Sequence, residues 1–129
     1  MKIQPDRIDT VAIQAHGPGW LVAGGRRFET SVVVSSDGAL RAWGCARWED
    51  LTEAHFAVLA EDAPEVVLFG SGRRLRFVAP ALLRPLIERG IGVETMDTMA
   101  AARTYNILAS EGRRVVAALL LEQPANPQT

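Results

Sequence analysis

The sequence predicts an α/β fold: a three-layer sandwich on a mixed β-sheet, with N-terminal antiparallel strands followed by a βαβαβ half. Two patterns support this prediction. The first third contains short β-branched runs separated by glycine turns, which is typical of antiparallel strands. The last half alternates short apolar runs with amphipathic stretches, which indicates parallel strands joined by right-handed helical crossovers. With 129 residues, the chain is expected to form a single domain over residues 1–129, with a flexible lead-in at 1–7 and a flexible tail at 123–129.

Turn signals divide the first third into five short strands. Asp37-Gly38 is a tight-turn dipeptide between two apolar runs, and His16-Gly17-Pro18-Gly19 has the composition of a turn. Gly24-Gly25 interrupts a third apolar run. The strands are expected over residues 10–15, 20–23, 26–28, 31–35 and 39–43.

The second half begins with a helix capped by Thr52, which starts near Glu53 and ends before Pro64 because the residue before a proline avoids the helical region. Another helix starts at Pro80 and ends at Gly90, and Pro85 must lie in its first turn or kink it. The last helix, capped by Asp97 or Thr98, is expected over residues 99–110. Apolar runs predict buried strands over residues 66–69, 91–96 and 115–121.

Composition excludes several classes of function. A net charge of −1 opposes a general attraction to nucleic acid, so no nucleic-acid partner is expected. Cys45 is the only cysteine, so the chain can form neither an intrachain disulfide nor a cysteine-based metal cluster. The first residues resemble no signal peptide, and no apolar run approaches the ~18 residues of a transmembrane segment. We therefore expect a soluble, cytoplasmic protein.

The candidate site lies where two parallel strands end. The loops leaving these strands emerge at the same edge of the sheet, and they carry glycines, arginines and a helix N-terminus. Such an edge can bind a carboxylate or a phosphate. The alternative is that the glycines only form a turn and the polar residues only cap the helix. The candidate binding residues are Gly70, Ser71, Gly72, Arg73, Arg74, Asp97, Thr98, Arg103, Tyr105 and Asn106.

Motifs for nucleotide binding and catalysis are incomplete. A dinucleotide fingerprint lacks its third glycine, where Leu75 stands, and a P-loop lacks its lysine. Cys45 has no histidine beside it in the sequence and is interpreted as a small buried residue. The sequence therefore assigns no catalytic residue, no cofactor and no metal ligand.

Three segments resemble a known family. They are GPGWLVAGGRRFETSVVVSSDGALRAW, VVLFGSGRRLRF and GIGVETMDTMAAARTYNILASEGRRVVAALL, within residues 8–121. They are similar to a small α/β family of uncharacterised bacterial and archaeal proteins whose mitochondrial member is an assembly factor for respiratory complex I. The resemblance implies the three-layer sandwich and no established activity or cofactor. The chain departs from the family pattern at Met99 and Ala102, where relatives often have glycine and cysteine.

These observations favour binding over catalysis. The first hypothesis is a non-catalytic accessory protein, similar to an assembly factor, that binds another protein through the Gly70–Arg74 and Asp97–Thr98 loops. The second is a protein, or an enzyme, that binds a small anionic ligand such as a nucleotide or carboxylate at the same edge.

Overall fold

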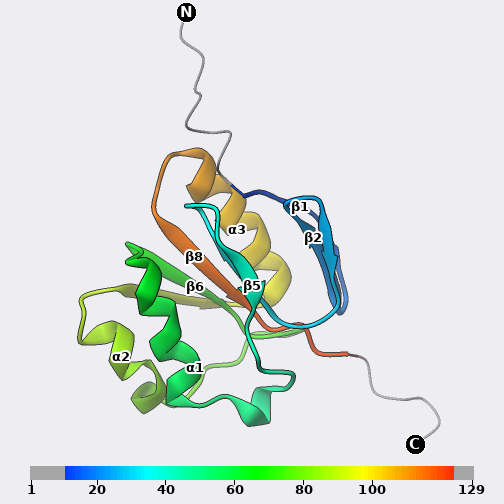
Figure 1. The fold of residues 1–129 in the computed structure, drawn as a ribbon. Helices are drawn as coiled ribbons and strands as arrows, with labels where there is room; N and C mark the ends of the chain where they lie inside the picture. The colour runs from blue at the N-terminus through cyan, green and yellow to red at the C-terminus, as the bar shows by residue number, and fades with distance from the viewer. Residues whose placement is uncertain (1–10, 124–129) are drawn as a thin grey trace, which may run out of the picture.

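The fold consists of two β-sheets with helices on both sides of the larger one (Figure 1). The computed structural model describes residues 11–123. A three-stranded antiparallel sheet has the order β1-β2-β3, and a five-stranded mixed sheet has the order β5-β4-β8-β6-β7. The strands are β1 (Ile13–Gly17), β2 (Trp20–Ala23), β3 (Arg26–Phe28), β4 (Val32–Ser35), β5 (Leu40–Ala42), β6 (Val66–Gly70), β7 (Gly92–Met96) and β8 (Val115–Leu119).

The last strand of the chain, β8, lies in the middle of the larger sheet. It pairs antiparallel with β4 and parallel with β6, while β7 pairs parallel with the other side of β6. Every residue of β8 is buried. A strand in this position is covered on both faces, which explains why its sequence is a continuous apolar run and not an alternating one.

Two hydrophobic cores lie on opposite faces of this sheet. Val115, Ala117 and Leu119 of β8 belong to the core beneath α3 (Thr98–Ser110) and the small sheet. Val116 and Ala118 belong to the second core, beneath α1 (Glu53–Ala57) and α2 (Arg84–Ile87). Figure 1 shows these elements on the two sides of β6 and β8. The predicted three-layer sandwich on a mixed sheet is thus confirmed, and no helix within residues 11–123 is long and apolar enough to cross a membrane.

The helices that cover the second core, α1 and α2, are shorter than predicted. The stretch from Pro80 forms a 3-10 helix over Pro80–Leu83, and only Arg84–Ile87 is α-helical. Pro85 has no N–H to donate to the preceding turn, so it lies in the first turn of α2. The helix after Thr52 likewise changes into a 3-10 helix over Val58–Asp62.

The first hairpin also differs from the prediction. β1 extends to Gly17, which pairs with Trp20, so the turn shrinks to Pro18 and Gly19. Gly19 adopts a positive φ of 78°, which favours glycine. Residue 10, the predicted start of this strand, and the predicted lead-in at 1–7 lie outside the described residues, as does the tail from 124 onwards.

Tyr105 and Asn106 attach α3 to the first residue of β1 and to the chain just before it. The Tyr105 side chain is fully buried and its hydroxyl donates a hydrogen bond to the carbonyl oxygen of Val11. The Asn106 side chain accepts a hydrogen bond from the N–H of Ile13 and donates one to the carbonyl oxygen of the same residue, both at 2.8 Å. An amide that satisfies both backbone groups of one residue fixes the position of that strand on the helix.

We predict that stability falls at alkaline pH because of Tyr105. Burial raises the pKa of this phenol, with a smaller contribution from the charge of Asp37. An unfolded tyrosine ionises near pH ~10, so above that pH the unfolded state loses a proton that the folded state keeps, and the free energy of unfolding decreases. Tyr105 is the only tyrosine, so the ultraviolet absorbance of the phenolate reports on it alone.

The control is Tyr105→Phe, which should cost about 1 kcal/mol through the lost hydrogen bond but should remove this part of the alkaline dependence. Phenolate absorbance rising near pH ~10 while the protein is still folded would contradict the burial argument.

Candidate functional site

The predicted edge of the sheet forms around the end of β6. Gly70 pairs with Met96 in parallel register, so the loops after β6 and β7 emerge together. The two loops are joined by reciprocal hydrogen bonds of 2.9 Å: the N–H of Thr98 donates to the carbonyl oxygen of Gly72, and the N–H of Gly72 donates to Thr98 Oγ1. Thr98 Oγ1 also donates to the carbonyl oxygen of Leu120, at 2.8 Å. Thr98 is therefore a buried link between three segments.

Gly70 permits the close contact between β6 and α3. A Cβ atom at Gly70 would lie 2.9 Å from Cα of Thr98 and 3.0 Å from its Oγ1. The backbone of the helix cannot move away easily, because its first turn is held by the bonds of Thr98. The glycine is thus required by packing, whatever the edge binds.

The N-terminus of α3 is capped by its own chain. Asp97 Oδ1 accepts a hydrogen bond of 2.9 Å from the N–H of Ala100, and the N–H of Ala101 donates to the carbonyl oxygen of Asp97. Together with Thr98, these contacts occupy most of the donors on which the anion hypothesis depends. The Asp97 carboxylate also places negative charge where a bound anion would have to lie.

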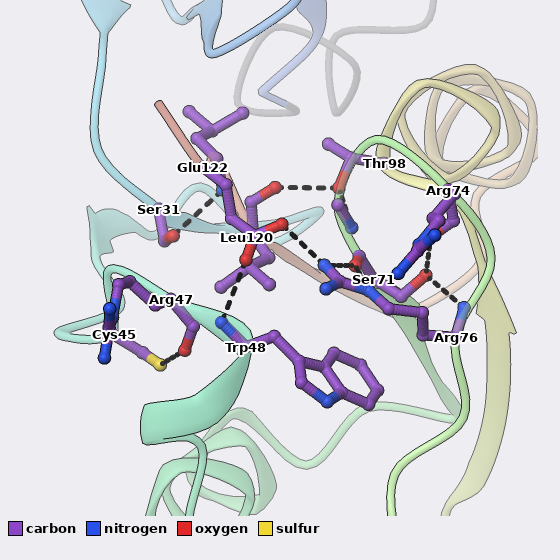
Figure 2. Close-up of polar contacts among 12 residues, drawn as sticks. Ser31, Cys45, Arg47, Trp48, Ser71, Arg74, Arg76, Thr98, Leu120 and Glu122 are labelled. Carbon is purple, nitrogen blue, oxygen red and sulfur yellow. Dashed lines mark hydrogen bonds and ion pairs between the residues drawn. The ribbon is translucent and has the colours of Figure 1, made fainter. Parts of the chain in front are cut away.

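Ser71 organises the loop that follows. Its hydroxyl donates to the carbonyl oxygen of Arg74 at 2.8 Å and accepts from the N–H of Arg76 at 3.0 Å. Its carbonyl oxygen accepts from Arg76 Nη2 at 2.6 Å. These contacts, shown in Figure 2, fold the loop back on a buried serine and leave that serine without a free polar atom for a ligand.

The centre of the edge is a cluster of Arg76, Glu122 and Trp48 that the sequence did not predict as a site. Arg76 Nη2 lies 2.5 Å from Glu122 Oε1, and the Arg76 guanidinium lies 4.5 Å from the centroid of the Trp48 ring. Glu122 Oε2 accepts a hydrogen bond of 3.0 Å from the N–H of Trp48 (Figure 2). Trp48 in turn stacks on Phe69 of β6. No sequence spacing connects these residues, and the only signal was a third arginine beside Arg73 and Arg74.

Arg73 lines two half-open depressions. One, of about 160 Å³, is lined by the first hairpin turn, the start of α3 and the end of the described chain. The other, of about 380 Å³, is lined by segments around residues 29–30, 46–47 and 121–123. Arg73, Leu121 and Glu122 line both. Pro18 and its neighbours form one wall of the first depression, whereas their sequence predicts only a turn. Within residues 11–123, neither Arg73 nor Arg74 forms an ion pair.

The remaining predicted residues lie elsewhere. The polar groups of Tyr105 and Asn106 bond Val11 and Ile13 and not the two loops of the edge. Arg103 is exposed on α3 and remains available to a partner. The edge thus brings together the Gly70–Arg74 and Asp97–Thr98 loops, with Arg73 and Arg74 as its exposed charges.

Cys45 does not form a catalytic pair with His55. Its thiol is buried and donates to the carbonyl oxygen of Arg47 at 3.1 Å, and burial raises its pKa. The ring of His55 contacts Thr52 and the carbonyl oxygen of Gly44. No cluster of three potential metal ligands exists in the part of the chain that the structure describes.

Gly70→Ala should destabilise the fold by about 1–3 kcal/mol, because the added methyl group overlaps the backbone of α3. The matched control is Gly92→Ala in β7, where a Cβ atom would meet nothing closer than 3.8 Å; its effect should stay within about 0.5 kcal/mol. Chemical denaturation of both variants provides the comparison. Equal losses of stability in the two variants would show that the contact between β6 and α3 does not restrict the side chain at position 70.

Cys45 should react with iodoacetamide at least about tenfold more slowly in the folded protein than in denaturant, since about 1.4 kcal/mol of protection suffices for that ratio. Burial limits access, and the raised pKa lowers the fraction of reactive thiolate. Equal rates measured by mass spectrometry would instead indicate an accessible thiol and reopen a nucleophilic role.

Comparisons with known proteins identify relatives of this chain. A Bos taurus protein, NADH dehydrogenase [ubiquinone] 1 alpha subcomplex assembly factor 3, is 35% identical over 104 residues, which are 79% of this chain and 55% of that protein. An uncharacterized protein of Rhodobacter capsulatus is 32% identical over 117 residues, covering 91% of this chain and 90% of the relative. The chain therefore spans about half the length of the animal assembly factor and nearly all of the bacterial relative.

Solved structures show the same fold. A crystal structure of a Bordetella parapertussis protein matches with a TM-score of 0.80 and 44% identity, covering 88% of this chain and 97% of the other. The solution structure of a Mth938-like domain from Bordetella pertussis matches with a TM-score of 0.78 and 36% identity, covering 95% and 92%. The family model for "Protein of unknown function (DUF498/DUF598)" matches residues 13–120. This confirms the resemblance seen in the sequence, and the chain belongs to the DUF498/DUF598 family.

Proposed function

We propose that this chain is a non-catalytic accessory protein that binds another protein during the assembly of a respiratory complex. The observation that carries the proposal is the difference between the buried and the exposed polar groups at the edge of the sheet. Buried polar groups there, such as those of Ser71 and Thr98, are satisfied within the chain, while Arg73 and Arg74 are exposed without ion pairs in the described residues. Arginines exposed in this way are available to pair with carboxylates on a protein surface.

The shape of the edge supports a protein partner over a small anion. Ligand pockets usually enclose most of a small molecule, whereas the depressions beside Arg73 are half open to solvent. The Asp97 carboxylate caps the N-terminus of α3 and opposes an anion at the backbone donors there. The N–H groups of Thr98, Ala100 and Ala101 at the helix N-terminus are used by Asp97 and by the loop after β6. Arg103, exposed on α3, is a further candidate contact.

The relatives suggest which process the partner belongs to. Several animal relatives are named as assembly factors of an NADH dehydrogenase. By analogy, the proposed partner is a subunit, or an assembly intermediate, of a respiratory NADH dehydrogenase. A cytoplasmic location is part of the proposal.

Deletion of the gene should reduce the amount of assembled respiratory NADH dehydrogenase, measured by activity staining of membranes on native gels. The wild-type gene should restore it, and a double variant with Arg73→Glu and Arg74→Glu should not, because it reverses the exposed charges of the edge. The matched control is Arg89→Glu, an exposed arginine before β7 at the opposite end of the parallel strands. Undiminished assembly in the deletion strain would overturn the proposed process.

A further inference from the structure

The segment Arg73–Phe77 exposes two large apolar side chains. Leu75 is 52% exposed and Phe77 is 70% exposed. The next residue, Val78, is partly buried against the second core, and Arg76 faces the cluster with Glu122 and Trp48. Single exposed apolar residues are common on protein surfaces. Here two of them alternate with residues whose side chains are fixed, so both lie on the same exposed side of the segment.

This segment is held in place although it has no regular secondary structure. Ser71 bonds the backbone of Arg74 and Arg76 at its start. The Arg76 side chain bonds the carbonyl oxygen of Ser71 and pairs with Glu122 while lying on Trp48. Leu75 and Phe77, on either side of Arg76, are therefore presented outward by a preorganised backbone. Binding through such a segment loses less conformational entropy than binding through a mobile loop.

The charge of the segment limits what can cover it. The sequence from Val66 to Ile87 contains four arginines and no acidic residue. Glu122 neutralises Arg76, but Arg73 and Arg74 have no acidic partner within residues 11–123. The surface around Leu75 and Phe77 is thus apolar with uncompensated positive charge, and its complement is apolar with negative charge.

We propose that the Arg73–Phe77 segment is the docking site for a protein segment that carries acidic side chains beside apolar ones. This inference rests on the proposed function and names the chemistry of its partner. Leu75 and Phe77 would be buried by the partner's apolar side chains, and Arg73 and Arg74 would pair with its carboxylates. An anionic membrane fits less well, because two arginines contribute only about 1 kcal/mol each at a lipid surface, which is too little for stable attachment with two apolar side chains.

The test replaces Phe77 by the photoreactive benzoylphenylalanine in the full chain, produced in its native host. The expected product is a cross-link to a protein peptide that contains acidic and apolar residues, identified by mass spectrometry. Reversing the charges of Arg73 and Arg74 to Glu in the same chain should lower its yield at least about tenfold, whereas Arg89→Glu should not. Benzoylphenylalanine at Ile107, which is 57% exposed on α3, controls for chance contacts of an exposed apolar position. Melting curves confirm that each variant is folded.

Four results would overturn the inference: adducts with lipid alone, adducts with a second copy alone, a yield no greater than at Ile107, or a yield unchanged by the charge reversal. The deletion experiment is independent of this test. Loss of the assembled complex on deletion, with no specific product at Phe77, would leave the proposed function and reject this docking site. A charge-dependent cross-link to an acidic protein outside the respiratory complex would support this docking site and reject the proposed function.

Discussion

The structure depends on the close contact between the end of β6 and the first turn of α3. The absence of a side chain at Gly70 lets the two backbones approach, and Thr98 then bonds Gly72 and Leu120. This contact holds together the loop after β6, the N-terminus of α3 and the segment after β8. Because all three meet there, the contact also fixes the positions of Ser71 and of the arginines that follow it.

The same contact explains why the edge differs from the ligand-binding edges of many α/β proteins. In those proteins, glycine turns and helix N-termini leave backbone donors free for a ligand. Here the N–H groups of Gly72, Thr98 and Ala100 are already bonded to groups within the chain. What remains for recognition is a set of exposed side chains: Arg73, Arg74 and the apolar residues that Arg76 holds outward.

Local patterns in the sequence were sufficient for the layers, most strands and the edge itself, because apolar runs and turn residues determine these locally. Local patterns could not predict the roles of residues whose contacts lie far away in the sequence. The ion pair of Arg76 and Glu122 joins residues far apart in the sequence, and the role of Asn106 depends on β1 lying against α3. The short α2 follows from Pro85, but the sequence left open whether this proline would begin the helix or kink it.

We propose that the edge recognises a partner through side chains and not an anion through backbone donors. Titration of the isotope-labelled protein with inorganic phosphate, followed by amide chemical shifts, tests it most directly. We expect no saturable shifts at the amides of Gly72, Thr98 and Ala100, because each already donates within the chain. Saturable shifts confined to these amides and to Arg73 would contradict it and would establish an anion site at this edge.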